Sequence, residues 1–445
     1  MNHFQSIRTP QLDTYNREAL RNYFQNTWEL QDLLMKSSIG QDTFYLSPDP
    51  LRNRLIFYLG HAAVFYINKL IQVGLVERRI DPEYEILFEV GVDPETPEEL
   101  DAAMAQVNWP AVEEVWHYRH QLRDAILETI DRAPLERPIR QDTPLWALMM
   151  GIEHDRIHFE TSSMLLRQLS LDRVQRPEGW HYAPSTGKPP ENQMRRVPGG
   201  TVELGKPANS PLYGWDSEYG NRTVEVQPFF ASKYLISNGE FLTFLERGGY
   251  ENRECWDEES WAWKTEYQVK HPKFWRPTEN GYRYRATFDE LDLPLDWPVE
   301  VNHYEAMAFC RWQGTRLMSE AEWNLAVGEE PTTDGDPVAV NAYNLNLKYG
   351  SPSPVGAIES ACSRDGLYDL RGNLWELIGD RFYPLPGFKP HPLYEDQSAP
   401  FFDTKHCMML GGSWATTGTM AAKSYRNWFR PYFYQHAGFR TARDA

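Results

Sequence analysis

Two histidines, His154 and His158, lie four residues apart in the stretch GIEHDRIHFE, residues 151–160, which otherwise has the pattern of an apolar helix. A spacing of four places both rings on one helical face, about one turn apart, so that one nitrogen of each can reach a single ion. A third histidine, His61, lies in the middle of another apolar segment, LRNRLIFYLGHAAVFYINKL. Two imidazoles from one helix and one from a neighbour predict three metal ligands on one side of an ion, with its other positions open for substrates.

The alternative interpretation of an HxxxH pair is a pair of hydrogen-bonded core histidines, because the pattern is common by chance. Two small residues on the same face, Ala147 and Gly151, favour a metal site, since we expect them to leave room for something other than a side chain. Three neutral imidazoles suit zinc, iron or copper, and the ligand type alone does not choose among them. A zinc peptidase would need Glu directly after the first histidine as its general base, and Asp155 stands there instead.

The composition excludes several classes of partner. The chain has 445 residues, with 45 Lys and Arg against 63 Asp and Glu, which gives a formal net charge of −18. Such a charge repels phosphate backbones and anionic lipid, so we expect no nucleic acid and no membrane as partner. No secretory signal is visible near the N-terminus, and we expect a cytoplasmic protein. The four cysteines are widely spaced without a CxxC pair, which argues against a disulfide scaffold or a cysteine-ligated zinc site.

The chain divides into two parts of different character, which together predict an α+β protein. Apolar residues at three- and four-residue spacing predict four helices, at about 14–36, 51–74, 110–132 and 144–168, and these predict an antiparallel four-helix bundle over residues 1–170. Residues 171–195 are polar and rich in Pro and Gly, as in a linker. In the second domain, residues 196–445, we expect a strand pair around a turn in VPGGTVELG and a strand that runs into a short helix in VQPFFASKYLISNGEFLTFLERGG.

Several blocks of the sequence resemble a known family. They include SPDPLRNRLIFYLGHAAVFYINKL, FEVGVD, MGIEHDRIHFETSSMLLRQL, WPVEVNHYEAMAFCRW, GNLWEL, GGSW and QHAGFR. In this order they resemble the 5-histidylcysteine sulfoxide synthases of ovothiol biosynthesis, which are relatives of the ergothioneine sulfoxide synthases. The resemblance runs from about residue 10 to about residue 440.

The resemblance implies a fold and a reaction. It implies a DinB-like four-helix bundle joined to a C-type-lectin-like domain of the formylglycine-generating-enzyme, or sulfatase-modifying factor, type. It also implies a non-haem Fe(II) held by His61, His154 and His158, with O₂ as co-substrate. The implied reaction joins the sulfur of cysteine to the imidazole ring of histidine as a sulfoxide. The alternative within the family is an ergothioneine-type enzyme that takes trimethylhistidine, with cysteine, γ-glutamylcysteine or a selenium donor.

The resemblance also implies substrate-binding residues near the C-terminus, in RNWFRPYFYQHAGFR. Arg426 and Arg430 are candidates to bind a substrate carboxylate, because an arginine fork matches a carboxylate, and Trp428 and Phe429 accompany them. Phe429 stands where ergothioneine relatives have Asp, which argues against the same contact to the amino group of the thiol substrate. The alternative for the two arginines is structural pairing within the domain.

Two tyrosines, Tyr383 and Tyr394, are candidates for the proton donor or redox-active phenol that the family implies, and either could instead be a packing residue. The chain stops soon after QHAGFR, so on the ovothiol route we expect methylation to need a separate methyltransferase. Two further classes remain open. One is a zinc-dependent thiol transferase or hydrolase on a DinB-like bundle, and the other is a binding protein whose histidines are structural.

Overall fold

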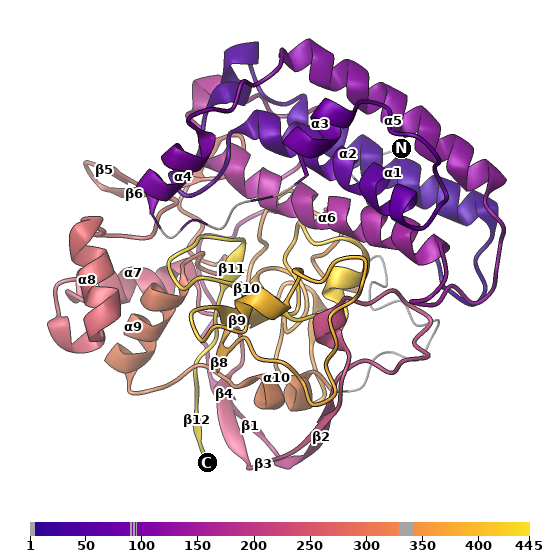
Figure 1. Cartoon of the computed structure of the whole chain (residues 1–445). Coiled ribbons are helices and arrows are strands. Elements are labelled where there is room, and N and C mark those ends of the chain that lie inside the picture. Colours follow the sequence, from indigo (N-terminus) through magenta and orange to yellow (C-terminus); the bar gives the residue numbers. More distant parts are fainter. Residues whose placement is uncertain (1–4, 90, 92–93, 95, 329–341) are drawn as a thin grey trace. The chain divides into compact units, whose positions relative to one another are not determined.

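The structure is a computed structural model that describes all residues except 1–4, 90, 92–93, 95 and 329–341. The chain forms two compact units (Figure 1). The first unit is residues 1–179 with 211–213, and the second is residues 180–210 with 214–445. The segment expected to be a linker, residues 171–195, is therefore divided between the two units.

Four long helices build the first unit, and each lies inside one of the four segments that the sequence predicted as helical. They are α1 Arg17–Met35, α2 Leu55–Gln72, α5 Val112–Arg132 and α6 Leu145–Gln168. Helix α6 packs against α1 and α2, and α5 packs against the same two helices from the other side (Figure 1). The four helices thus close a ring around a shared core.

The first unit also contains short helices that the sequence analysis did not predict. Between α2 and α5 lie α3, Pro82–Leu87, and α4, Pro97–Met104, and 3₁₀ turns occupy Gln41–Tyr45 and Leu171–Arg173. Both α3 and α4 begin with proline directly after a capping side chain, Asp81 or Thr96, that accepts hydrogen bonds from the first turn. This is a strong local start signal, and it could have been found in the sequence.

Helix α2 is buried along most of its length. Every residue from Leu55 to Asn68 is buried, and so is Leu70. The helix is apolar nearly all round because α6, α5 and α3 each pack against a different part of it. This confirms the expectation that His61 lies in the middle of a buried segment.

The second unit contains several small sheets. One has the strand order β1-β4-β12, with β1 Met194–Val197, β4 Phe229–Ser232 and β12 Ala442–Asp444. A second has the order β10-β9-β8-β11, with β8 Trp375–Arg381, β9 Cys407–Leu410, β10 Asn427–Phe429 and β11 Ala437–Gly438. The remaining sheets are β2 Gly200–Leu204 with β3 Arg222–Val226, and β5 Trp275–Thr278, β6 Gly281–Arg285 and β7 Glu290–Asp292.

Helices and 3₁₀ turns connect these strands. The helices are α7 Asn238–Glu246, α8 Glu258–Glu266, α9 His303–Gln313 and α10 Glu320–Val327. The 3₁₀ turns are Asp216–Glu218, Arg253–Cys255, Glu359–Ala361, Ala399–Phe401 and Gly418–Ala421. Side chains from β1, β4, α10, β8 and β9 share one apolar core, which includes Val197, Phe229, Trp323, Ile378 and Met408.

The prediction that the two strands of VPGGTVELG pair with each other is wrong. Both strands exist, but β1 pairs with β4 and β2 pairs with β3. The chain passes from one sheet to the other at Gly199, where an added Cβ would lie 2.5 Å from the carbonyl oxygen of Val226. Because this crossing needs a close backbone approach, the Pro-Gly-Gly run does not close a hairpin. The second expectation is confirmed, since β4 runs into α7.

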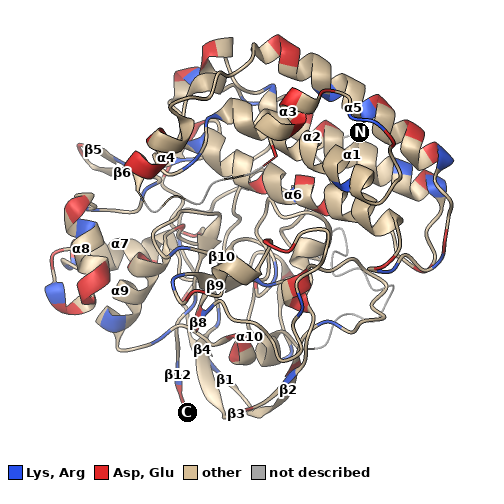
Figure 2. Cartoon of the chain, in the orientation of Figure 1, with Lys and Arg blue, Asp and Glu red and all other residues tan. Residues whose placement is uncertain are grey.

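No helix in the described residues is long and apolar enough to cross a membrane. Basic side chains are scattered among acidic ones along the chain (Figure 2). The four cysteines, Cys255, Cys310, Cys362 and Cys407, are free thiols, as the sequence predicted.

Gly151 allows α6 to approach α2 closely. An added Cβ at this position would lie 2.4 Å from Cδ1 of Tyr66 on α2. The room that we expected beside the histidines is therefore filled by a side chain, and that part of the sequence interpretation is wrong. The reason is that an aromatic ring of a neighbouring helix needs the same gap that a bound group would need.

Replacing Gly151 with alanine tests this contact. Overpacking costs about 1–3 kcal/mol, whereas alanine gains about 1 kcal/mol over glycine within a helix. We expect Gly151→Ala to lower the free energy of unfolding by about 1 kcal/mol, measured by urea unfolding followed by helical circular dichroism. The control is Gly379→Ala, whose nearest contact would be an ordinary 3.6 Å. Equal stability of the two variants would contradict the tight packing.

Candidate metal centre

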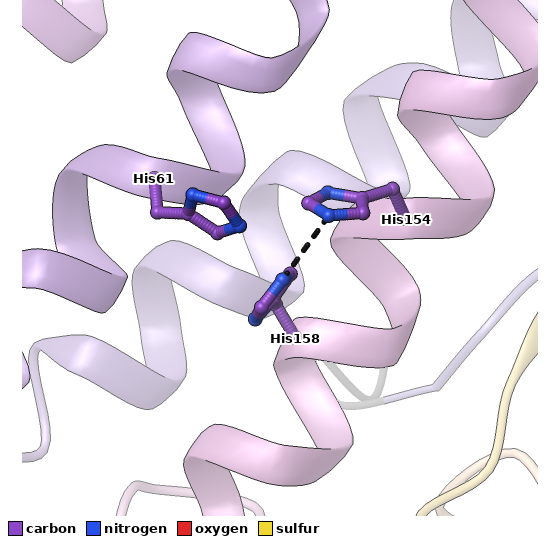
Figure 3. Close-up of side chains that lie close together, drawn as sticks. All are labelled: His61, His154 and His158. Atoms are coloured by element: carbon purple, nitrogen blue, oxygen red, sulfur yellow. Dashed lines mark hydrogen bonds between the residues drawn. The ribbon is translucent and has the colours of Figure 1, made fainter. Parts of the chain in front are cut away.

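The structure brings His61, His154 and His158 together (Figure 3). One ring nitrogen from each lies within 4.8 Å of the corresponding nitrogen of the other two. His61 comes from α2 and the other two come from successive turns of α6, and all three rings point toward a common centre. The Nε2 atoms of His154 and His158 are 3.2 Å apart. The geometry is the one that the spacing predicted, and metal binding itself stays a prediction.

The orientation of His61 is set by a backbone group. Its Nδ1 lies 2.7 Å from the carbonyl oxygen of Phe88. A carbonyl oxygen only accepts, so Nδ1 must carry the proton and donate it. The lone pair of the neutral ring is then on Nε2, which is the nitrogen left to bind an ion.

Two phenylalanines of α2 support the histidine rings. The Phe65 ring is stacked on His154, with centroids 3.6 Å apart and an interplanar angle of 9°. The Phe57 ring is stacked on His61, with centroids 4.8 Å apart. The sequence analysis missed both residues. Because Phe57, His61 and Phe65 follow one another at intervals of four, their common helical face was readable from the sequence.

Burial keeps the three imidazoles neutral. His61 is 5% exposed and His154 is 3% exposed. Burial lowers the pKa of His61 to about 4. The pKa values of His154 and His158 are also lowered well below the ordinary value, first by burial and then by the neighbouring histidines. Neutral rings keep the lone pairs that a metal needs.

The distance between the two α6 histidines fits a shared metal ion. Two nitrogens that bind one ion at about 2.1 Å, at an angle near 100°, lie roughly 3.2 Å apart. The observed separation of 3.2 Å between the Nε2 atoms of His154 and His158 matches this value. The ligand nitrogen of His61 lies within 4.8 Å of both, so the three imidazoles could share one ion, and imidazole is a ligand type that suits iron. The residues present therefore fit the ion that the resemblance implies.

Asp155 does not stand as a catalytic base beside these nitrogens. Its Oδ2 accepts a hydrogen bond of 3.3 Å from the hydroxyl of Tyr66. The side chain is buried, and burial raises the pKa of its carboxyl to about 7. Among the described residues, the cluster that could hold an ion contains only the three histidines. The zinc-peptidase alternative therefore gains no support from the geometry.

In the second unit, Arg426 already has a carboxylate partner. Its Nε donates to Oε1 of Glu320 at 2.7 Å, and its Nη2 donates to the other oxygen at 3.2 Å. The Tyr383 hydroxyl donates to the same carboxylate, and burial together with the charge of Glu320 raises the pKa of this phenol. These contacts favour the structural alternative for Arg426, and substrate binding by Arg426 stays a prediction.

The other predicted residues of the C-terminal block lie in or beside strand β10. Trp428 stacks on Phe401 with ring centroids 3.9 Å apart, as a packing residue of the core does. Phe429 follows it on the opposite face of the strand, and Arg430 is buried. The substrate-binding roles of Trp428, Phe429 and Arg430 stay predictions.

Tyr394 lies in a different environment from Tyr383. Its ring is half-buried, with its centroid 6.5 Å from that of Trp215. Burial raises the pKa of the phenol, and the nearby carboxylates of Asp396 and Asp216 raise it further. The phenol is therefore neutral at neutral pH, and the role of Tyr394 as a proton donor stays a prediction.

Comparison with known proteins identifies the family. The model of the sulfatase-modifying factor enzyme 1-like domain matches residues 182–445. The hercynine oxygenase of Mycolicibacterium thermoresistibile is 31% identical over 89% of this chain and 88% of its own length. That of Mycobacterium tuberculosis is 32% identical over 74% of this chain and 77% of its own. The chain belongs to the hercynine oxygenase family.

Membership in this family makes the chain an oxidative enzyme, as the sequence predicted, and confirms the sulfatase-modifying factor type of its second domain. A more distant relative is ergothioneine biosynthesis protein 1 of Neurospora crassa, which is 25% identical over 97% of this chain and 58% of its own length. These relatives belong to the ergothioneine branch of the sulfoxide synthases. The domain match begins at residue 182, so part of the expected linker belongs to the domain.

Removing a histidine tests the metal centre. We expect His61→Ala and His154→Ala each to lower bound iron after reconstitution and desalting by at least about tenfold. The reason is that each variant leaves only two of the three histidine ligands, and two ligands hold the ion more weakly than three. Metal analysis measures the content, and circular dichroism verifies folding. His117→Ala is the matched control, since this histidine of α5 is exposed. Iron content that is equal in all variants would contradict the site.

The lowered pKa values predict how the stability of the metal-free protein depends on pH. The unfolded chain takes up protons on these histidines below about pH 6.5, whereas folded His61 does so only near pH 4. Stability from this group is therefore complete above about pH 6.5 and falls as the pH drops toward 4, by up to roughly 3 kcal/mol. Urea unfolding at about pH 7.5 and pH 5 measures the effect. His61→Asn should lose less stability between these pH values than wild type, and exposed His120→Asn should behave as wild type.

Proposed function

We propose that the chain is an iron(II)- and O₂-dependent sulfoxide synthase of the ergothioneine type, which joins the sulfur of a thiol to the imidazole ring of hercynine, the trimethylated form of histidine. The observation that carries the proposal is the convergence of His61, His154 and His158 in a chain of the hercynine oxygenase family. The ring of four helices that carries them supports a DinB-like bundle as the finer description of the first unit.

The reaction balances without any further reagent. A thiol, a ring C–H and one O₂ give a sulfoxide and one water. The C–S bond and the S–O bond replace one S–H and one C–H bond, and O₂ accepts the four electrons. Iron bound to the three histidines would supply the redox chemistry that lets O₂ react with closed-shell substrates.

The residues of the bundle suit an anionic substrate sulfur. His61, His154 and His158 are all neutral ligands, so they leave the charge of a divalent ion uncompensated in a buried site. Such a site favours a thiolate over a thiol. The Phe57 and Phe65 rings keep water away from the ring faces of two of the ligands.

Tyr383 and Tyr394 are the two candidates for the proton donor. The hydroxyl proton of Tyr383 is already donated to Glu320, next to Arg426. Withdrawing it from this buried network would leave a carboxylate with one hydrogen bond fewer. These contacts favour a structural role for Tyr383, and Tyr394 stays a candidate for the proton donor.

A second candidate function is the ovothiol-type reaction, in which unmethylated histidine replaces hercynine. The blocks SPDPLRNRLIFYLGHAAVFYINKL and QHAGFR favour it, because they carry the resemblance to that branch. Phe429 affects how the thiol substrate binds. It stands where ergothioneine relatives have an Asp carboxylate that contacts the amino group of the thiol substrate, so here that substrate must be bound through other contacts. On the ovothiol route a separate methyltransferase would act later.

A competition assay tests both candidates. The enzyme is incubated with Fe(II), O₂ and cysteine or γ-glutamylcysteine, together with equal amounts of histidine and hercynine, and the product masses are read. We expect the hercynine sulfoxide to form at least about tenfold faster, because three methyl groups replace the three N–H donors of the histidine ammonium group, and a site that fits one of these cations fits the other poorly. Preference for histidine would establish the second candidate instead. Zinc content without oxygen uptake would contradict both, and so would full activity of His154→Ala.

A further inference from the structure

The hydrogen bond to His61 comes from a short helix that is itself anchored to α2. The acceptor, the Phe88 carbonyl, stands directly after the last residue of α3. The position of that oxygen therefore depends on how α3 packs on α2. Side-chain contacts between the two helices fix this packing.

The first lock is a close approach at Gly60. An added Cβ there would lie 2.5 Å from the ring of Phe88, so only glycine allows the ring to cross α2 at this point. Phe88 is completely buried. Its ring thus lies against the residue directly before His61, and its carbonyl reaches the ring of His61 itself.

The second lock is the buried carboxylate of Glu85, in the middle of α3. Its Oε1 accepts from the backbone nitrogens of Ile80 at 2.7 Å and Asp81 at 3.1 Å, and its Oε2 accepts from Arg79 Nη1 at 2.9 Å. Glu85 is 0% exposed, and a carboxylate buried to this degree is stable only with such partners. The three donors fold the chain before α3 onto its own first turn.

Asn68 ties this cluster to α2. Its Nδ2 donates to the backbone oxygen of Glu85 at 3.1 Å, and its Oδ1 accepts from Arg79 Nη1 at 2.9 Å. Asn68 lies seven residues after His61, which is two turns along the same face of α2. Helix α3 is thus fixed at two points on one face, at Asn68 through Glu85 and at His61 through Phe88.

We propose that Glu85 is a positioning residue for the metal centre: with Arg79 and Asn68 it fixes α3 so that the Phe88 carbonyl holds His61 with Nε2 directed at the ion. The inference rests on the proposed function, because it takes His61 as a ligand. Without this anchor the ring can turn about its Cβ–Cγ bond, and the ligand nitrogen no longer has a fixed direction.

The test is the affinity of the full-length metal-free protein for Co(II), used as a spectroscopic probe in place of Fe(II). We expect Glu85→Ala to weaken binding by about 10- to 100-fold, the range found when groups that orient a ligand are lost. Its Co(II) absorption spectrum should also change. The matched control is Glu83→Ala, an exposed position on the same helix, which should behave as wild type. Glu85→Gln keeps an acceptor for the backbone nitrogens and should give an intermediate loss.

A double-mutant cycle separates positioning from a general loss of structure. If Glu85 acts through His61, then Glu85→Ala should cause little further loss of affinity in a His61→Ala background. An additional loss of the same size in that background would overturn the inference, and so would a wild-type spectrum and affinity for Glu85→Ala. If Glu85→Ala does not fold, the intermediate variant Glu85→Gln decides in its place, with wild-type affinity and spectrum overturning the inference. If wild type and His61→Ala bind Co(II) equally, the metal site itself is wrong, and the inference fails with it.

Discussion

Three imidazole rings directed at one another inside a helical bundle constrain the rest of the first unit. The Nε2 atoms of His154 and His158 lie 3.2 Å apart, a distance at which one ring can donate a hydrogen bond to the other. Each neutral ring has one N–H group and one lone pair. At His61 the N–H is used by the Phe88 carbonyl, so the lone pair points toward His154 and His158. Protonation would relieve the crowding of lone pairs, but burial opposes it, as the lowered pKa values show. A metal ion would satisfy all three nitrogens at once, and the packing of α2 against α6 keeps the three rings together.

The packing of α2 among its neighbours explains its unusual composition. A helix that presents one ligand to a neighbour and is held by other helices elsewhere cannot be amphipathic, because it has no face left for water. Its small residues follow the same logic. Gly60 admits the Phe88 ring on the α3 side, and on the other side Gly151 of α6 admits Tyr66 of α2. Glycine costs helix stability at both positions, and here it gives close contact at the two places where the ligand helices must be fixed.

Much of the first unit could be predicted from the sequence, because the spacing of apolar residues shows where a helix lies and which of its faces is buried. The periodicity placed four long helices within a few residues of their ends, and the spacing of four placed His154 and His158 together. What could not be predicted are contacts between residues far apart in the chain. The Phe88 carbonyl, a backbone group 27 residues after His61, carries no signal in residue type, and the gap at Gly151 gave no sign that Tyr66 fills it.

The second unit was harder to predict because its strands are short and pair out of sequence order, as at β1 and β2. Its tryptophans and short motifs suggested irregular structure without saying which motif meets which.

The structure gives those motifs a physical meaning. Arg440 of QHAGFR is completely buried and donates to Glu376 of GNLWEL at 2.7 Å, and its guanidinium also donates to the backbone oxygens of Ser232 and Tyr368. His436 of the same block lies 3.2 Å from Glu300 of WPVEV. Breaking one partner of such a buried pair leaves a charge or a donor without compensation, which costs several times more than a surface pair does. These residues therefore hold irregular loops in place.

It follows that the motifs by which the second unit is recognised stabilise its fold, and that they say little about which substrate it binds. The resemblance in these blocks to one branch of the family, and the match of the whole chain to the other, do not conflict on this account. A buried ion pair such as Arg440 with Glu376 stabilises the fold in the same way whichever substrate is bound. The choice between histidine and its trimethylated form must instead depend on the side chains that surround the α-nitrogen of the acceptor, because one form offers three N–H donors there and the other offers three methyl groups.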